Sequence, residues 1–301
     1  MITVMGATGN TGAKISHTLL QAGHHVRALG RSEAKLAELA RAGAEVRVGD
    51  VTDTRFLTAA FTGADAVYTL LPTDRRAADY RAAQDREGET IVAAIRNSGV
   101  RYVVALSSLG GDLGEGVGVI SGLHAQEERM KHLLDVNVLI LRPVSFFENL
   151  LDHVDLVRQE GILTDSVAAD VAVPMVATRD IAEVAARALA ARDWFGFVAH
   201  ELLGPRDLTH REATRILGNA LGVPSAEYVH VSENEMIGAL VEAGLSNSFA
   251  MQYVEMTRAF NERRVNARRT PANTTSTSFE DFVQLQLQLQ ATDLVGADAA
   301  A

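Results

Sequence analysis

The sequence predicts an α/β fold built on a doubly wound parallel sheet, and three features of residues 1–143 support that prediction. Short apolar runs alternate with amphipathic stretches, which is the order expected of successive β-α-β units. The apolar runs contain few polar residues, as strands do when helices cover both faces of a sheet. Glycines close the amphipathic stretches just before the next run, where a left-handed residue commonly ends a helix. These glycines are Gly23, Gly43, Gly63 and Gly99.

Strands and helices follow in order from this alternation. We expect strands over residues 2–5, 25–29, 45–48, 64–71, 102–107 and 138–141. The helices between them are expected over residues 11–22, 32–41, 54–61, 77–97 and 123–134. Ser32 is placed to cap the second helix, because its hydroxyl can accept a hydrogen bond from the first turn. Parallel strands joined in this way use right-handed crossovers.

The second half of the chain is predicted to form a small, mainly helical C-terminal lobe. Helical periodicity covers residues 146–160, 178–190, 209–221, 233–243 and 248–260, and a last turn or two is expected over 279–283. Thr209 and Glu212 have the spacing of a capping box. Gln and Leu alternate over 284–290, which fits either a helix extension or an edge strand. We therefore divide the chain into a core, 1–150, an interleaved lobe, 151–290, and a loose tail of small residues, 291–301.

Charge and composition argue against several classes of function. The formal net charge is −10, whereas nucleic-acid binding usually needs a basic face. The short basic run formed by Arg263, Arg264, Arg268 and Arg269 is expected to be a solvated segment. The chain has no cysteine, which excludes disulfides and thiolate metal sites.

Metal binding and membrane insertion are not expected either. His24 and His25 have no carboxylate cluster beside them, and Asp152, His153 and Asp155 do not share one face of a helix. No apolar run reaches the roughly 20 residues that span a bilayer. The first residues read as a strand and not as a secretory signal, so we expect a cytoplasmic location.

A glycine-rich loop stands between the first strand and the first helix. Residues 6–12 read Gly-Ala-Thr-Gly-Asn-Thr-Gly. Gly6 permits a tight turn, Gly9 lets a pyrophosphate approach the backbone, and Gly12 allows the helix to pack closely on the strand. The helix N-terminus offers its N–H groups to the anion. The loop therefore predicts a Rossmann-type domain that binds a dinucleotide through Gly6, Thr8, Gly9, Asn10, Thr11 and Gly12.

The end of the second strand indicates which dinucleotide is preferred. Enzymes that use NAD usually carry an acidic residue there for the ribose hydroxyls, but this chain has Arg31. A guanidinium suits a ribose 2′-phosphate, and Lys35 lies one helical turn further on. We expect NADP(H) to be preferred, with NAD(H) as the other dinucleotide it can accept. The alternative is that Arg31 only faces solvent.

Other residues are predicted to line the dinucleotide along the edge of the sheet. They are Asp50 and Val51, which would flank the adenine, and Leu71 and Pro72, which end the fourth strand. Ser107 ends the fifth strand, where such sheets bind ligands. Its hydroxyl is expected to touch nicotinamide or substrate, or else to cap the loop.

The sequence resembles the NmrA-like branch of the atypical short-chain dehydrogenases/reductases. The resemblance covers roughly residues 1–285 and is carried by the glycine loop, Arg31, Ser107-Ser108, Leu141-Arg142-Pro143 and Phe147-Glu148-Asn149. It implies a lobe over the nicotinamide, a cofactor contact at Pro143, and a role for Glu148 and Asn149 in fixing the crossover into the lobe. Members include quinone, azo and iminium-type reductases, and regulators that sense the cofactor without turnover.

The chain lacks the Tyr-x-x-x-Lys pair that protonates the substrate in ordinary members of this superfamily. None of its five tyrosines lies between Ser107 and Arg142. His124 stands there, and the resemblance implies that it faces the nicotinamide ribose. A histidine can also donate a proton near neutral pH, or play a purely structural part.

These features predict an NAD(P)H-dependent reductase. It would transfer hydride to a small electron-poor acceptor of the quinone, azo, enone or iminium type, which does not need a dedicated phenol donor. His124 and Ser107 are its candidate catalytic residues, and its partners are small molecules. The alternative is a redox sensor that binds the dinucleotide without turnover. The oligomeric state stays open.

Overall fold

The computed structural model describes residues 1–298, with side chains described through residue 288. Its main sheet has seven parallel strands in the order β3-β2-β1-β4-β5-β6-β9. The strands are β1 (Ile2–Val4), β2 (Val26–Gly30), β3 (Glu45–Val48), β4 (Ala66–Thr69), β5 (Tyr102–Leu106), β6 (Asn137–Pro143) and β9 (Phe197–Leu202). The predicted α/β fold with a doubly wound sheet is confirmed, and all six predicted strands are present.

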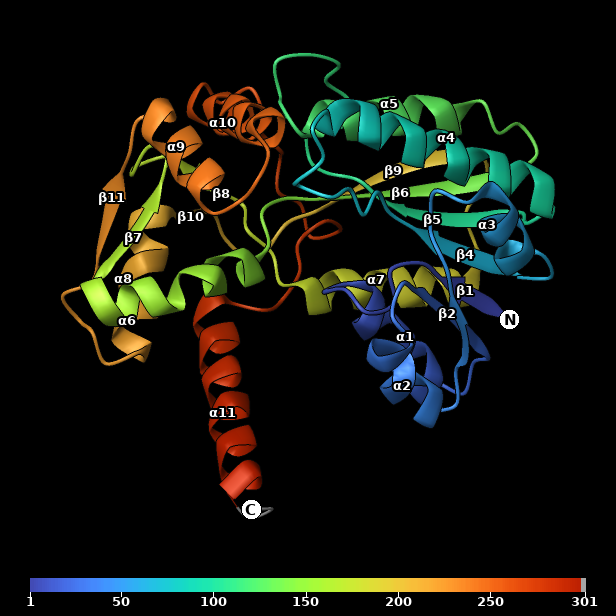
Figure 1. The fold of residues 1–301 in the computed structure, drawn as a ribbon, viewed down its shortest axis with the longest axis horizontal. Helices are drawn as coiled ribbons and strands as arrows, with labels where there is room; N and C mark the ends of the chain where they lie inside the picture. The colour runs from blue at the N-terminus through green and yellow to red at the C-terminus, as the bar shows by residue number, and fades with distance from the viewer. Residues whose placement is uncertain (299–301) are drawn as a thin grey trace.

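Helices cover both faces of this sheet (Figure 1). One face carries α1 (Gly12–Gln21), α2 (Glu33–Arg41) and α7 (Thr178–Ala191), and the other carries α3 (Thr54–Phe61), α4 (Tyr80–Ser98) and α5 (Ile120–Lys131). Each layer buries its own apolar core against the strands. Ser32 caps α2 by accepting a hydrogen bond from the Lys35 N–H, as predicted. The four glycines that mark helix ends all have a positive φ, between 75° and 97°.

The seventh strand, β9, was not predicted. It lies at the edge of the sheet and pairs only with β6. Val198 and Ala199 are exposed there, and the strand continues into His200 and Glu201. An edge strand of this kind has no second sheet neighbour, so its sequence lacks the continuous apolar run of the central strands.

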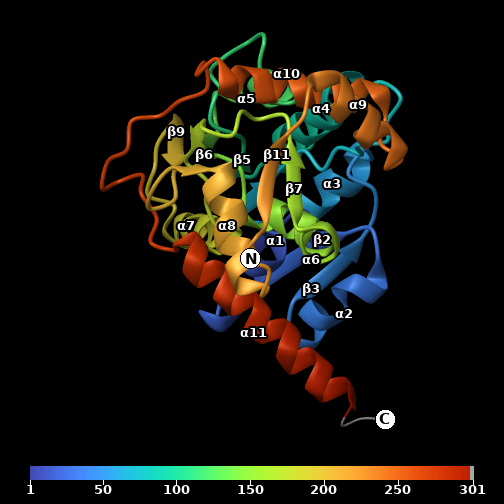
Figure 2. The same cartoon turned by 90° about the vertical axis from the view of Figure 1, so that its left-hand side faces the viewer.

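The C-terminal lobe lies beyond the carboxyl ends of the main strands (Figures 1 and 2). It contains the 3-10 helix η1 (Phe147–His153) and helices α6 (Val154–Glu160), α8 (His210–Ala220), α9 (Glu233–Glu242), α10 (Asn247–Asn261) and α11 (Phe279–Asp298). Two small sheets join it, formed by β7 (Ile162–Asp165) with β11 (Glu227–His230) and by β8 (Ala172–Val173) with β10 (Leu208–Thr209). The mainly helical lobe is confirmed, although its short strands were not predicted.

Three expectations for the lobe need correction. The Gln-Leu alternation is helical, and the same helix runs on to Asp298, so residues 291–298 are not a loose tail; residues 299–301 lie outside the described part. Thr209 caps α8 through the Glu212 N–H, but the Glu212 carboxylate binds Arg206 and does not complete a capping box. The basic run is not simply solvated, because Arg264 donates to the carbonyls of Glu115 and Gly116 and Arg269 pairs with Asp207.

Among the described residues there is neither a metal-binding cluster of side chains nor a membrane-spanning helix. No group of three or more His, Asp or Glu side chains among them is arranged to hold a metal ion. No helix in the described part of the chain is both long enough and apolar enough to cross a membrane.

A buried polar cluster surrounds Asp165 at the end of β7. Tyr253 of α10 donates its phenol proton to Asp165 Oδ2 at 2.8 Å, and His210 Nε2 of α8 lies 3.9 Å from the same oxygen. His210 Nδ1 is buried without a hydrogen-bond partner among the residues described. Burial lowers the pKa of His210 and of His153, and the nearby charge of Asp165 offsets this only in part.

We expect the protein to lose stability as the pH falls through about 6.5, the ordinary pKa of histidine. Because both histidines have a lowered pKa in the folded chain, the unfolded chain takes up protons first. The stability is present above pH 6.5 and is lost progressively as the pH falls below it. Melting temperatures from pH 8 to pH 5.5 check this. The slope should shrink in His210→Asn but not in His25→Asn, which removes an exposed histidine; equal slopes would contradict the assignment.

Candidate functional site

The glycine loop turns the chain sharply from β1 into α1. Gly6 has a φ of +65°, a left-handed conformation that favours glycine, and its carbonyl accepts from the Gly9 N–H at 2.9 Å. A Cβ on Gly12 would lie only 2.2 Å from the Gly6 carbonyl oxygen. The first turn of α1 therefore packs directly against the loop backbone, and Gly12 is required by the fold itself.

Gly9 is different, because nothing inside the protein requires it to be glycine. A Cβ there would meet only the Gly6 carbonyl oxygen at 3.4 Å, and the residue is exposed and has no left-handed φ. The absent side chain instead leaves space on the outer side of the loop. That is the arrangement a pyrophosphate needs in order to reach the backbone, so the loop fits a dinucleotide.

The N-terminus of α1 keeps its N–H groups available for an anion. Thr11 occupies the N-cap position but makes no side-chain cap; its Oγ1 accepts a hydrogen bond from the buried Tyr68 hydroxyl at 2.9 Å. Within the described residues, the N–H groups of Asn10, Thr11 and Gly12 donate to no protein acceptor. With exposed Thr8, they are the groups predicted to bind the anion, and that binding remains a prediction.

Arg31 and Lys35 lie at the end of β2 and in the first turn of α2. Both are exposed, and neither side chain forms a hydrogen bond or ion pair within the part of the chain that the structure describes. Asp50 lies near Arg31. Its pKa is lowered mainly by hydrogen bonds from the Thr52 N–H and hydroxyl, and less by the Arg31 charge. Arg31 is thus a cation that none of the described side chains neutralises by direct contact.

The remaining predicted cofactor residues lie along the carboxyl ends of β3, β4 and β6. Val51, Leu71 and Pro72 are half-buried, and Pro143 is buried at the end of β6. The Pro143 carbonyl accepts from the Leu109 N–H at 2.7 Å, which joins it to the loop after β5. Their contacts with a dinucleotide remain predictions.

A buried carboxylate on α4 was not predicted. Glu87 accepts a hydrogen bond from Thr73 Oγ1 at 2.7 Å, and burial raises its pKa. Thr73 follows Pro72 at the end of β4, so Glu87 ties that loop to the helix behind it.

Ser107 is held by a buried ion pair. Its Oγ donates to Glu127 Oε1 at 2.6 Å, and Arg142 Nε donates to the same carboxylate oxygen at 3.0 Å. A Cβ on Gly111 would lie 2.9 Å from Ser107 Oγ, so the loop backbone covers the hydroxyl. The Ser107 hydroxyl proton is therefore committed to Glu127, and contact of Ser107 with nicotinamide or substrate remains a prediction.

Glu127 was missed in the sequence. The neighbouring acid, Glu128, instead pairs with the exposed Lys131 on the outer side of α5. Glu127 is three residues after His124, a spacing that also places side chains on one face of a helix. That spacing, together with Arg142 in the following strand, is the feature of the sequence that could have identified Glu127.

His124 lies under the loop that follows β5. Its Nδ1 is 3.0 Å from the Gly111 carbonyl oxygen. A carbonyl can only accept, so Nδ1 carries the proton and Nε2 is an acceptor in the neutral ring. Nε2 can therefore accept from a ribose hydroxyl, whereas proton donation from Nε2 requires the charged imidazolium.

The fold and this loop define a dinucleotide-binding protein of the Rossmann class. The model of the NmrA-like family matches residues 1–283, and the chain belongs to that family, as the sequence predicted.

Similar proteins are reductases. The chain is 27% identical over 250 residues to the NAD(P)H azoreductase of Xenophilus azovorans, covering 83% of this chain and 84% of that one. It is 32% identical over 224 residues to the (4-alkanoyl-5-oxo-2,5-dihydrofuran-3-yl)methyl phosphate reductase of Streptomyces griseus, covering 74% and 75%. The NADPH complex of an NADPH-dependent quinone oxidoreductase from Escherichia coli shares the fold with a TM-score of 0.80 at 21% identity, covering 95% and 100%.

The two glycines of the loop should respond differently to substitution. We expect Gly9→Val to abolish NADPH binding in calorimetry while the melting temperature stays close to that of the wild type, because the added side chain fills only the outer space. Gly12→Ala should lower the melting temperature, since its Cβ overlaps the Gly6 carbonyl. Gly238→Ala, where a Cβ meets nothing within 4 Å, is the control. Undiminished NADPH affinity in Gly9→Val would refute the assignment of the loop.

Proposed function

We propose that this protein is an NAD(P)H-dependent reductase that passes hydride to a small electron-poor acceptor and prefers NADPH. The observation that carries the proposal is the open space outside Gly9. No contact within the described structure requires glycine there, and the missing side chain leaves room for a pyrophosphate. The named relatives are reductases and oxidoreductases, which agrees with the activity predicted from the sequence.

The cofactor preference follows from Arg31. An exposed guanidinium without a protein partner is available for forked hydrogen bonds to a ribose 2′-phosphate. Lys35, in the first turn of α2, is also exposed and adds a second positive charge near the end of β2. NAD(H) lacks the 2′-phosphate, so it should bind more weakly through the same loop.

The residues of the chain supply positioning and shielding. When bound, the reduced dinucleotide supplies the hydride. His124, with its Nδ1 proton committed to Gly111, presents Nε2 as an acceptor. Ser107, at the end of β5, is held by Glu127, and the lobe lies beyond the carboxyl ends of the strands, where it would exclude water.

The acceptor class follows from the absence of a phenol donor in α5. A quinone, azo group, iminium or enone takes the new electron pair into a delocalised system or already carries positive charge. The relative from Streptomyces griseus is named for a substrate with an unsaturated lactone ring.

We also propose a cytoplasmic location, with small molecules as the partners of the protein.

A panel assay tests the proposal. Purified protein, NADPH and one member of each acceptor class are mixed, and loss of the nicotinamide absorbance is followed. We expect oxidation above the uncatalysed rate with at least one class. Tight NADPH binding without oxidation of any acceptor would instead favour the sensor.

Arg31→Asp should reverse the cofactor preference. Loss of the charged contact should cost NADPH about 1–3 kcal/mol relative to NADH. The ratio of kcat/KM for the two cofactors measures this, and Arg41→Asp, a change on the exposed end of α2, is the control. An unchanged ratio would mean that Arg31 does not read the phosphate.

His124→Ala should raise the KM for NADPH without unfolding the protein. The ring is half-buried and has one hydrogen bond to the loop, so its removal costs little core packing. Steady-state kinetics and a thermal melt check this together. A large fall in the melting temperature with an unchanged KM would show that His124 is only structural.

A further inference from the structure

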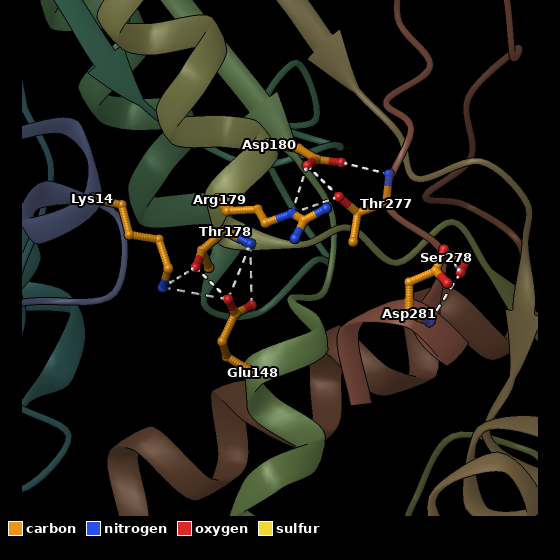
Figure 3. Close-up of polar contacts among 8 residues, drawn as sticks. All are labelled: Lys14, Glu148, Thr178, Arg179, Asp180, Thr277, Ser278 and Asp281. Atoms are coloured by element: carbon orange, nitrogen blue, oxygen red, sulfur yellow. Dashed lines mark hydrogen bonds and ion pairs between the residues drawn. The ribbon is translucent and has the colours of Figure 1, made fainter. Parts of the chain in front are cut away.

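Lys14 in the first turn of α1 contacts the glycine loop from the protein side. Its Nζ donates to the Asn10 carbonyl at 3.1 Å and to Thr178 Oγ1 at 2.8 Å. It also lies 3.5 Å from Glu148 Oε1 (Figure 3). One ammonium group thus touches the loop, the first turn of α7 and the crossover into the lobe.

Glu148 holds Thr178, the residue of α7 that Lys14 contacts. Its two carboxylate oxygens accept from the Thr178 N–H at 3.2 and 3.1 Å, and Thr178 Oγ1 also donates to it. Ala177 occupies the N-cap position of α7 and has no side chain to serve as a cap, so Glu148 supplies it from another segment. The Glu148 side chain is only 10% exposed and needs the Lys14 charge as its partner.

The same turn of α7 also holds the segment that leads to α11. Asp180 accepts from the Thr277 N–H at 3.0 Å, and Arg179 Nε donates to Thr277 Oγ1 at 2.8 Å. Ser278 then caps α11 through the Asp281 N–H. Figure 3 shows these groups gathered around the start of α7. The glycine loop and the lobe are therefore connected through the first turn of α7.

We propose that Lys14 is a positioning residue for the pyrophosphate of the dinucleotide, and that Glu148 and Thr178 fix its position. By holding the Asn10 carbonyl, Lys14 keeps the adjoining peptide oriented so that the loop N–H groups face outward to the anion. Lys14 is also the cation against the Glu148 carboxylate, which holds it in place. This inference rests on the proposed dinucleotide binding and adds a residue that never needs to touch the cofactor.

The test compares two ligands in Lys14→Met. NADP+ carries the pyrophosphate, whereas 2′-AMP carries only the adenosine and the 2′-phosphate. We expect Lys14→Met to weaken NADP+ binding about tenfold, the effect of one charge-assisted hydrogen bond, and to leave the Kd of 2′-AMP within about twofold. Lys131→Met, an exposed lysine on α5, is the control. Equal weakening of both ligands, or unchanged NADP+ binding, would overturn the proposal.

Two further variants separate positioning from charge and from folding. Lys14→Arg keeps the donor and should restore most of the NADP+ affinity. Lys14→Met combined with Glu148→Gln removes both charges, and we expect it to remain as weak as Lys14→Met. Recovery of affinity in the double variant would mean that repulsion alone explains the loss, and the positioning role would be wrong. If wild-type protein binds 2′-AMP but not NADP+, or binds neither, the proposed function itself fails.

Discussion

The close contact between Gly12 and the Gly6 carbonyl is the constraint on which the rest of the structure depends. It presses the start of α1 against the end of β1, and this sets the direction in which the first-turn N–H groups point. The other residues of the site lie on elements around that turn. Arg31 follows β2, Ser107 follows β5, and Lys14 lies on the helix that the turn begins. His124 lies on α5. The outer surface of the turn is left bare only at Gly9.

Two acidic side chains of the site lose their hydration on folding, and each is compensated by a neighbouring cation. Glu148 and Glu127 are both buried acids, and each has a cation against it, Lys14 and Arg142 respectively. Buried ion pairs of this kind add little net stability, because desolvation cancels much of the attraction. They instead fix geometry. The Glu148 pair holds the crossover into the lobe against α7, and the Glu127 pair holds the Ser107 hydroxyl at the end of β5.

Much of the fold could be predicted from periodicity, and the rest could not for physical reasons. Central strands have continuous apolar runs because two layers bury them, whereas the apolar run of β9 at the edge is interrupted by His200 and Glu201 and the lobe strands are only a few residues long. The loop could be identified because its strand–turn–helix context is local. Glu127 could not be distinguished from Glu128, because the rotation of α5 about its axis depends on how it packs against β6 and α4. The covering of Ser107 by Gly111 likewise depends on a loop path that no local pattern specifies.

The isolation of Arg31 has a consequence for how such a protein diversifies. No other side chain in the described structure is bonded to this guanidinium, so replacing it breaks nothing that the scaffold uses to stay folded. On the proposed role of Arg31, single substitutions at this one solvent-facing site would move the protein between the two cellular pools of reducing power. The residues at the ends of β5 and β6, several strands away in the sheet, would keep their positions.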